Sequence, residues 1–496
     1  MATNSEEISQ WVLGPRGLRS PASRYPLLGT QAVRTLERIT QAQLPPHTLM
    51  ERAGLALAQL ALAYQPHANT IWIACGRGNN GGDGMHAARH LQQWGKSPKV
   101  SLVDGTKPLP ADAADALHKA QQAGVGFVTS APAQWELGID ALCGSGLRQA
   151  PRGAVAAHIQ QLQAGTGRVV AADLPSGLAG DTGFAAGDCV RAHATLSFLA
   201  LQPGLFTGHG RDVCGDVWLN TLGVESAVTA DALLGAPGIA PARSHTSHKG
   251  SFGDLAVVGG ASGMAGAALL AATAGLQGGA GRVFLALLDS SAQPAALTRQ
   301  PALMCRTVPE LAVENMGVVA GCGGGTAIVE YLPALIARAA YLVLDADALN
   351  ALAAQPALRT LLAQRAANTT VLTPHPLEAA RLLGCSTAEV QANRLDCAQT
   401  LAQSMLCTVI LKGSGSVVAT PNGVPWINTS GNPRLATGGT GDVLAGLVGA
   451  YLAQGLNSED AAKLAVYQHG LAADQWPNHR SFSATALAEN LTPNWP

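Results

Sequence analysis

The sequence predicts an α/β protein with two domains, each a mostly parallel sheet covered by helices on both faces. Short apolar runs typical of buried strands alternate with segments in which apolar residues recur every three or four positions, as in helices. This alternation favours parallel sheets with helices packed on both sides. Glycine-rich turns follow several of the predicted strands. At 496 residues the chain is too long for one ordinary core, so more than one domain is expected.

The composition favours dissolved small molecules as partners. The chain is 47% hydrophobic and 13% charged with a formal net charge of −1, so it lacks the basic footprint of a protein that binds nucleic acid or an anionic membrane. Its nine cysteines include no C-x-x-C pair, which argues for a reducing compartment and against a zinc site or disulfides. Without a signal pattern or an apolar run of about 18 residues, a cytoplasmic protein is predicted. The Ala-rich, weakly charged surface favours a homo-oligomer.

The first half of the chain is predicted to hold a loose leader, 1–25, and a domain, 26–225. Residues 32–63 are expected to be helical, with a break at Pro45-Pro46. Beyond them strands and helices alternate. The predicted strands are 70–74, 99–103, 139–142, 168–172, 193–198 and 216–220, and the predicted helices are 83–94, 111–123 and 153–164.

The second half is predicted to be a different α/β domain, 245–496, after an Ala-, Gly- and Pro-rich linker, 226–244, that lacks a clear period. Two short strands joined through Pro421-Asn422-Gly423 read as a hairpin, 416–419 with 424–427. The tail from Asn478 looks irregular. The other predicted strands are 255–258, 282–287, 318–320, 341–345, 370–372 and 409–411, and the helices are 264–276, 376–383, 390–406, 440–454 and 459–475.

A glycine loop follows the first predicted strand, in the segment Gly-Arg-Gly-Asn-Asn-Gly-Gly-Asp-Gly from Gly76 to Gly84. Open α/β sheets bind ligands at the carboxyl ends of their strands. The spacing satisfies G-x-G-x-x-G, so an ordinary dinucleotide site stays open as an interpretation, although Asp83 would place a negative charge where a pyrophosphate meets the helix. A Walker A loop is excluded because no Gly-Lys-Ser/Thr follows.

Two later strands end in similar loops. Asp140 precedes Ala-Leu-Cys-Gly-Ser-Gly-Leu-Arg148, and Asp173 precedes Leu-Pro-Ser176-Gly. Oxygen ligands alone (Asn80, Asp140 and Ser176) suit a hard cation rather than zinc. Each residue alone could instead be a turn or capping residue, but three such loops at one sheet edge favour a site.

A longer motif lies in the second half, Asn428-Thr-Ser-Gly-Asn-Pro-Arg-Leu-Ala-Thr-Gly-Gly-Thr-Gly-Asp-Val-Leu-Ala-Gly-Leu447. Its glycines precede a helix whose first turn carries Asp442, where free backbone N–H groups and the helix dipole attract an anion. We expect Asp442 to deprotonate a hydroxyl that attacks a phosphoryl group held there. A helix cap is the simpler alternative. Lys412, after an apolar strand, is expected to contact a nucleotide phosphate.

The motifs of the first half, G-x-G-N-N-G-G-D-G, D-A-L-x-G-S-G and D-x-P-S-G, resemble the NAD(P)H-hydrate epimerase domain, and Leu49-Met-Glu-Arg-Ala-Gly54 fits the helix that precedes them. The resemblance implies a Rossmann-like three-layer αβα fold and a potassium ion held by Asn80, Asp140 and Ser176. It implies Asp173 as the base, with Arg148 as its electrostatic partner. The implied substrate contacts are Asn79, Asn80, Gly81, Gly82, Asp83, Gly144, Ser145, Gly146, Leu147, Arg148, Gln149, Ala150 and Asp173.

The second half resembles the ADP-dependent NAD(P)H-hydrate dehydratase domain, which has the ribokinase-like αβα fold. The motifs are V-L-D-A-D-A-L-N, T-P-H-P-x-E-A-A-R-L, L-K-G and G-N-P-x-L-A-T-G-G-T-G-D-V-L-A-G. One departure is Gly321-Cys-Gly-Gly-Gly325, where relatives often read G-P-G-L-G. The resemblance implies Asp442 as the base and a magnesium ion at the phosphates. The implied hydrate contacts are Ala267, Gly323, His375 and Asp442, and the implied nucleotide contacts are Lys412, Gly413, Ser414, Gly415, Ser416 and Gly441.

Together the two resemblances imply a bifunctional repair enzyme for the hydrates of NADH and NADPH (NADHX and NADPHX). It would epimerise the R and S forms at C6 and dehydrate the S form at the expense of ADP, giving NAD(P)H, AMP and phosphate. One alternative is a ribokinase-like kinase of a small alcohol with a non-catalytic nucleotide-binding first domain. A first domain that only binds a partner is another.

Overall fold

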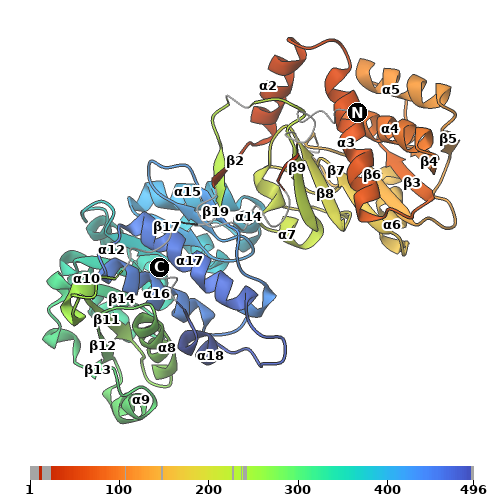
Figure 1. Cartoon of the computed structure of the whole chain (residues 1–496). Coiled ribbons are helices and arrows are strands. Elements are labelled where there is room, and N and C mark those ends of the chain that lie inside the picture. The colour runs from red at the N-terminus through yellow and green to blue at the C-terminus, as the bar shows by residue number, and fades with distance from the viewer. Residues whose placement is uncertain are drawn as a thin grey trace. The chain divides into compact units, whose positions relative to one another are not determined.

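The structure is a computed structural model, and it describes residues 11–13, 24–106, 108–146, 149–225, 228–235, 237 and 243–492. The chain divides into two compact units between Ala232 and Leu233, with Arg24 counted with the second unit (Figure 1). This division falls inside the segment predicted as the linker. Both units are α/β, so the predicted fold class is confirmed.

The first unit is built on an eight-stranded sheet of order β1-β9-β8-β7-β6-β3-β4-β5. Every neighbouring pair is parallel except β1 with β9. The strands are β1 (Trp11–Leu13), β3 (Thr70–Cys75), β4 (Ser97–Leu102), β5 (Gly126–Val128), β6 (Leu137–Ala141), β7 (Arg168–Ala172), β8 (Ala194–Phe198) and β9 (Asp216–Asn220). The helices are α2 (Thr30–Gln41), α3 (Thr48–Tyr64), α4 (Asn79–Gln93), α5 (Ala111–Gln122), α6 (Gly153–Ala164) and α7 (Gly210–Val213), and β2 (Arg24–Leu27) precedes α2.

Both faces of this sheet are buried. Because side chains alternate along a strand, Ile71 and Ile73 of β3 pack with α3, α4 and α5 on one face. Trp72 and Ala74 pack with α6 on the other face. The carboxyl ends of the parallel strands therefore open at one edge between two helical layers.

The second unit is built on a sheet whose strands run in the order β13-β12-β11-β14-β15-β16-β17-β18-β19-β10. All neighbours are parallel except β18, which is antiparallel to β17 and β19 and confirms the predicted hairpin. The strands are β10 (Ala232–Gly235), β11 (Asp254–Gly259), β12 (Arg282–Leu287), β13 (Met304–Cys305), β14 (Gly317–Ala320), β15 (Tyr341–Leu344), β16 (Thr370–Leu372), β17 (Thr408–Leu411), β18 (Val417–Ala419) and β19 (Trp426–Asn428).

Helices cover both faces of the second sheet as well. One face packs against α8 (Ala265–Gln277), α16 (Thr440–Ala453), α17 (Ser458–Asp474) and α18 (Ala484–Glu489). The other packs against α10 (Leu332–Arg338), α11 (Asp347–Ala354), α12 (Pro356–Leu362), α13 (Pro376–Leu383), α14 (Thr387–Ala392) and α15 (Arg394–Met405), while α9 (Gln293–Arg299) follows β12.

Several predicted boundaries were wrong. Helix α4 begins at Asn79 rather than Asp83, because tertiary packing keeps three glycines helical despite their poor propensity. The single helix predicted over 390–406 is two, because Asn393 leaves helical geometry and Ser386 caps a separate α14. The loose leader contributes β1, and the tail contributes α18. The segment predicted as a linker contains β10, which pairs with β19. Its sequence has no alternation of apolar and polar residues, so the strand was not predicted.

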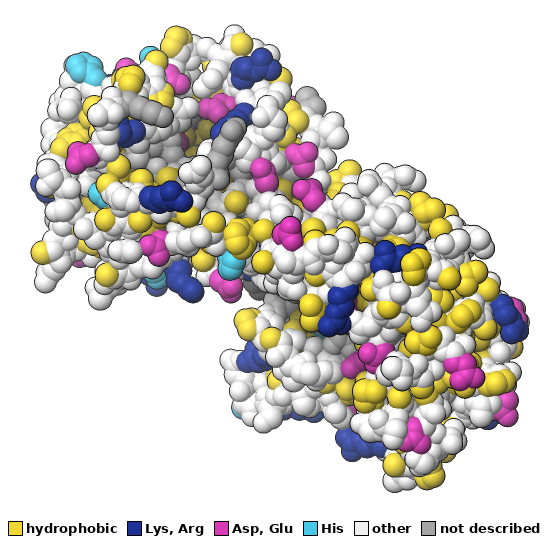
Figure 2. Space-filling model, turned by 180° about the vertical axis from the view of Figure 1, so that it is seen from behind, with side chains coloured by type: hydrophobic (Ala, Val, Ile, Leu, Met, Phe, Trp, Pro, Cys, Tyr) yellow, Lys and Arg dark blue, Asp and Glu magenta, His cyan; other side chains and the backbone are white. Residues whose placement is uncertain are grey.

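The surface agrees with the low charge content. On the face shown in Figure 2, acidic and basic side chains are both scattered among white and yellow surface. Among the described residues, no helix is long and apolar enough to cross a membrane.

Close packing between α8 and α16 gives a direct test of the fold. A Cβ added at Gly446 would lie 2.0 Å from the carbonyl oxygen of Ala271, whereas one at Gly266 would meet nothing within 4 Å. We predict that Gly446→Ala lowers the free energy of unfolding by about 1–3 kcal/mol, because the helices must move apart. Gly266→Ala is the control and should change it by less than about 1 kcal/mol. Urea unfolding measures both, and equal effects would contradict the packing argument.

Candidate active sites

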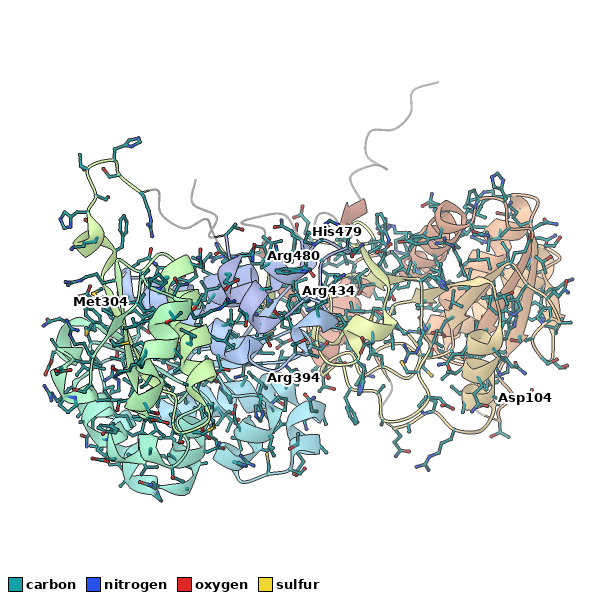
Figure 3. The ribbon with its side chains drawn as sticks, turned by 90° about the horizontal axis from the view of Figure 1, so that it is seen from below. Asp104, Met304, Arg394, Arg434, His479 and Arg480 are labelled. Carbon is teal, nitrogen blue, oxygen red and sulfur yellow. The ribbon has the colours of Figure 1, made fainter. Side chains whose placement is uncertain are left out.

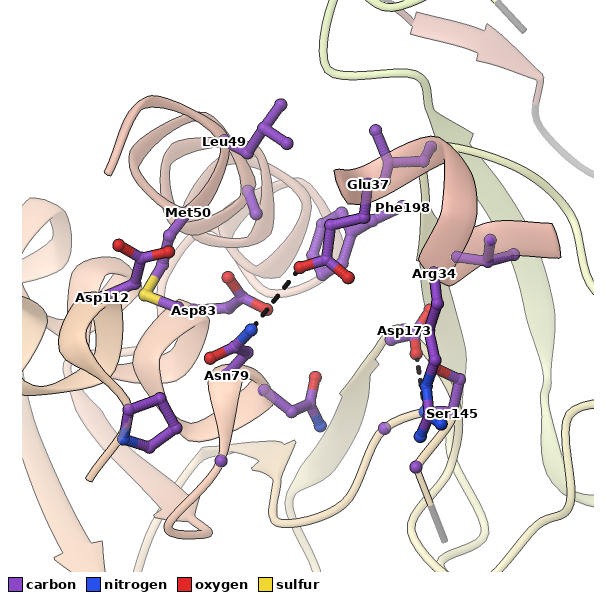
Figure 4. Close-up of a pocket in the computed structure, with 18 of the residues that line it drawn as sticks. Arg34, Glu37, Leu49, Met50, Asn79, Asp83, Asp112, Ser145, Asp173 and Phe198 are labelled. Carbon is purple, nitrogen blue, oxygen red and sulfur yellow. Dashed lines mark hydrogen bonds between the residues drawn. The ribbon is translucent and has the colours of Figure 1, made fainter. Parts of the chain in front are cut away.

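A cavity of about 550 Å³ opens at the carboxyl ends of the strands in the first unit (Figure 4). This volume suits a small-molecule ligand. Arg34 and Glu37 enter it from α2, and Asp112 enters from α5. Gln41 of α2 also lines it, and the three predicted loops contribute Gly78, Asn79, Asn80, Asp83, Cys143, Gly144, Ser145, Gly146 and Asp173. The structure therefore brings the three loops together, as the sequence predicts.

Asp173 follows β7 directly and projects into this cavity. Its backbone has φ of 61°, a left-handed conformation that aspartate tolerates better than most residues. The carboxylate accepts hydrogen bonds from Ser145 N at 3.0 Å and from Gln202 Nε2 at 3.1 Å. Burial raises the pKa of Asp173 to about 6. It is thus a carboxylate that can accept a proton near neutral pH and release it again.

Three further carboxyl groups, those of Glu37, Asp83 and Asp112, line the cavity with Asp173. Only Asp83 was predicted from the sequence. Burial raises the pKa of Asp83 well above its ordinary value, and the charges of Asp173, Glu37 and Asp112 add to the effect. Burial also raises the pKa of Glu37, although a 3.5 Å contact from Asn79 opposes the shift. A pKa shifted in this direction favours the neutral carboxyl, which would repel a pyrophosphate less at the start of α4. Glu37 and Asp112 lie outside every motif, so no sequence signal marked them.

The three residues predicted to hold potassium are all buried. Asp140 accepts hydrogen bonds from Ser176 N at 2.7 Å and Ser176 Oγ at 2.6 Å. Asn80 lies beside Gly144, whose added Cβ would be 3.5 Å from the Asn80 side chain. Neither the oxygen nor the nitrogen of the Asn80 side chain has a partner among the described residues. A buried amide oxygen without a partner, near an all-oxygen donor set, fits a hard monovalent cation.

Three glycines of the first loop, Gly76, Gly81 and Gly82, are needed for close packing. A Cβ at Gly76 would lie 1.9 Å from the Leu142 carbonyl oxygen, and one at Gly81 would lie 1.9 Å from the Gly76 carbonyl oxygen. Gly82 packs against Met50. Of the predicted substrate contacts, Gly81, Gly82, Gln149 and Ala150 do not line the cavity, and Leu147 and Arg148 lie outside the described residues.

The second site forms where β14, β15 and β17 end and α16 begins. One ligand atom each of Cys322, Asp345 and Asp442 lies within 4.8 Å of the others. Lys412 Nζ is 2.7 Å from Asp345 Oδ1, and Gly441 lies beside this ammonium group. The structure therefore places Asp442 beside a thiol and a second carboxylate at a sheet edge.

Lys412 and Asp345 are held by Glu378 of α13 and by Thr373, which directly follows β16. Thr373 Oγ1 donates to Asp345 Oδ1 at 2.7 Å, and Glu378 lies 4.0 Å from Lys412 Nζ. Although burial opposes it, the charges of Asp345 and Glu378 raise the pKa of Lys412, so the ammonium stays charged. His375 caps α13 by accepting from Leu377 N at 3.1 Å, and its Nε2 is 3.3 Å from Glu378. The capping role fixes the position of the His375 ring at the start of α13.

Asp442 lies in the first turn of α16, after Gly439 with φ of 92°. Burial raises the pKa of Asp442 to about 6, and the charge of Asp345 adds to this, while Cys322 and Lys412 oppose it. The Sγ atom of Cys322 lies 3.9 Å from Asp345 Oδ2. A carboxylate with this pKa suits a general base near neutral pH.

The remaining predicted contacts surround this centre. Ala267 and Gly323 are neighbours, since a Cβ added at Gly323 would lie 3.0 Å from the Ala267 Cβ. Gly413 has φ of 132°, which favours glycine, and Ser416 Oγ donates to the Gly413 carbonyl at 3.2 Å. Buried Arg394 (Figure 3) donates to the carbonyl oxygens of Leu411 and Lys412 at 3.3 and 3.2 Å. The guanidinium group of Arg394 therefore fixes the backbone that leads into Gly413, Ser414 and Gly415.

Two α/β units, each with carboxylates of raised pKa at the carboxyl edge of a parallel sheet, define a two-site enzyme acting on small molecules. A family model described as NAD(P)H-hydrate dehydratase matches residues 255–493, and one described as YjeF-related protein N-terminus matches residues 46–204. The chain belongs to the family of bifunctional NAD(P)H-hydrate repair enzymes, with an epimerase domain followed by a dehydratase domain.

Two relatives carry this conclusion. The bifunctional NAD(P)H-hydrate repair enzyme Nnr of Escherichia coli (strain K12) is 38% identical over 449 residues, covering 86% of this chain and 85% of that protein. The enzyme of the same name from Moorella thermoacetica is 34% identical, covering 92% and 93%. Among solved structures, the ADP/ATP-dependent NAD(P)H-hydrate dehydratase of Bacillus subtilis, co-crystallised with ATP and Mg²⁺, is 28% identical with a TM-score of 0.44, covering 51% of this chain and 92% of that one. The kinase alternative is not favoured.

The environment of Asp173 generates a prediction for the first site. If Asp173 must be ionised to act, epimerisation should fall about tenfold per pH unit below about pH 6, because the protonated fraction grows as pH falls through its pKa. Asp173→Asn should lower the rate by at least about 100-fold at pH 7.5. Equilibration of the R and S hydrates by chromatography measures both. Asp181→Asn, outside the cavity lining, is the control and should retain the rate.

Proposed function

We propose that the first unit inverts C6 of hydrated NADH and NADPH with Asp173 as the proton acceptor. The observation that supports this role is the Asp173 carboxylate in the cavity, beside Asn79, Asn80 and the Gly144–Gly146 loop. Ser145 N and Gln202 hold its two oxygens, so its orientation is set before substrate binds. The predicted partner Arg148 keeps its guanidinium charged at any physiological pH, and so is proposed to stabilise negative charge rather than to donate a proton.

The second unit is proposed to dehydrate the S hydrate with ADP. Asp442 takes the proton of the C6 hydroxyl as that oxygen forms a bond to the terminal phosphorus of ADP, and the bond from phosphorus to AMP breaks. The C6–O bond then breaks with phosphate as the leaving group, and loss of a neighbouring ring proton restores the double bond of NAD(P)H. The products are NAD(P)H, AMP and phosphate. Phosphate is a far better leaving group than hydroxide, so transfer of a phosphoryl group from ADP makes the loss of the C6 oxygen easier.

The residues around Asp442 support this assignment. Lys412, fixed by Asp345 and Glu378, presents an ammonium beside Gly441, where a phosphate would meet the start of α16. We propose Gly413 to Ser416 as further nucleotide contacts, and Ala267, Gly323 and His375 as hydrate contacts. Magnesium, when bound, would neutralise phosphate charge, and the carboxylates of Asp442 and Asp345 are the oxygen donors that it prefers.

Potassium, when bound, would hold the loops of the first site through oxygen ligands. Asn80, Asp140 and Ser176 are proposed to supply them. We also propose that the protein acts in the cytoplasm, as a homo-oligomer, on dissolved NADHX, NADPHX and ADP.

The decisive assay supplies the mixed R and S hydrates with ADP and follows the absorbance of the reduced ring. Full recovery is expected of the unaltered protein. Asp173→Asn should recover only the S fraction, because the R form is no longer converted. Asp442→Asn should recover none, while still equilibrating the two hydrates, which shows that the chain is folded. Recovery by Asp442→Asn at the unaltered rate would contradict its role as base, and phosphorylation of a small alcohol instead would favour a kinase.

Removal of potassium tests the cation site. Replacing potassium with tetramethylammonium should slow epimerisation and leave ADP-dependent dehydration of pure S hydrate unchanged. Asn80→Ala should lower the epimerisation rate roughly tenfold or more and remove its dependence on potassium. Asn79→Ala, one residue away on the same helix end, is the control that should keep the potassium dependence. A potassium-independent enzyme would contradict the assignment.

A further inference from the structure

A second group of possible metal ligands lies on the helical layer of the first unit, away from the cavity. Glu51 of α3, His86 of α4 and Asp115 of α5 each offer one ligand atom, and these atoms lie within 4.8 Å of one another. None of the three lines the epimerase cavity. Three helices that pack together thus converge one imidazole and two carboxylates on one point.

His86 is the unusual member of this group. Its side chain has 0% exposure, and neither ring nitrogen has a hydrogen-bond partner among the described residues. Buried polar groups are almost always bonded, so an imidazole with both nitrogens unsatisfied needs an explanation. Gly54 of α3 packs directly against it, since an added Cβ would lie 2.3 Å from the His86 Cβ. The ring is therefore confined beside the two carboxylates, and burial lowers its pKa to about 4, which leaves it neutral with a free lone pair.

The two carboxylates already hold a cation. Lys119 Nζ lies 2.7 Å from Glu51 Oε1 and 2.9 Å from Asp115 Oδ2, and Arg89 Nη1 lies 4.0 Å from Glu51 Oε1. An ammonium group carries three hydrogen-bond donors and one charge. A divalent ion would bring twice that charge and would also use the imidazole lone pair that Lys119 leaves idle.

We propose that Glu51, His86 and Asp115 form a binding site for a divalent transition-metal ion, Zn²⁺ in the first place, with Lys119 as a displaceable stand-in. One imidazole nitrogen and two carboxylate oxygens make a three-ligand set that leaves a position for water. An imidazole favours zinc or cobalt over magnesium or calcium, which prefer oxygen ligands alone. The ion would join α3, α4 and α5, and α4 carries the loop that enters the epimerase cavity at its start.

Metal binding to the full-length protein tests this site. Chelator-treated protein is titrated with Zn²⁺ by calorimetry and with Co²⁺ by absorption spectroscopy, in a Cys322→Ala background that removes the thiol of the other described cluster. One equivalent should bind, with a cobalt spectrum that lacks a thiolate charge-transfer band. His86→Gln should weaken binding by roughly tenfold or more. His158→Gln is the control, because that buried histidine also has an unbonded nitrogen but stacks on Trp72 away from the cluster.

Lys119→Ala distinguishes a metal site from a purely structural ion pair. Removal of the competing ammonium should tighten Zn²⁺ binding by about tenfold or more, whereas Lys463→Ala, which breaks a comparable surface pair with Glu459, should leave it unchanged. Circular dichroism checks that each variant is folded. Absence of a bound equivalent in the starting protein, equal binding by His86→Gln, or unchanged or weaker binding by Lys119→Ala would each overturn the proposal.

Discussion

The burial of carboxylates at the carboxyl edge of each sheet is the constraint on which both sites depend. A carboxylate taken out of water becomes easier to protonate unless hydrogen bonds or cations compensate. Asp173 and Asp442 receive only part of that compensation, and both have a pKa near 6. Asp345 is instead bonded by the ammonium of Lys412 and the hydroxyl of Thr373. A carboxylate with a raised pKa suits a proton acceptor, whereas one held by a cation and a hydroxyl group suits a residue that positions others.

Glycine residues allow the close backbone packing that shapes these sheet edges. Gly76 and Gly81 let the first loop fold back on its own backbone, and Gly446 lets α16 lie against α8. The helix that presents Asp442 is therefore placed by contacts several residues from its carboxylate. In both units some glycines of the motifs, such as Gly76, Gly81 and Gly446, allow one backbone segment to lie close against another.

Much of this could be predicted from the sequence. Strands such as β7, β9, β12 and β16 have the predicted limits, because each is a short apolar run whose ends are marked by polar residues or turns. The motifs also identified the loops that meet in the first cavity. Positions whose role arises from distant contacts escaped notice: Glu37 approaches Asn79 from a helix with no motif, and Asp112 contributes its charge to Asp83 from the start of α5. The start of α4 was misplaced because packing overrides the low helix propensity of its glycines.

Arg394 has a consequence for the way a nucleotide would be received. Its guanidinium is buried beneath the chain and bonded to two consecutive carbonyl groups, next to Gly413. The conformational entropy of this turn is therefore lost when the chain folds, and not when a nucleotide binds. Binding to such a preorganised turn costs little further conformational entropy, so the affinity depends mainly on the contacts with the nucleotide. Association and dissociation can then both be fast while the contacts still determine selectivity.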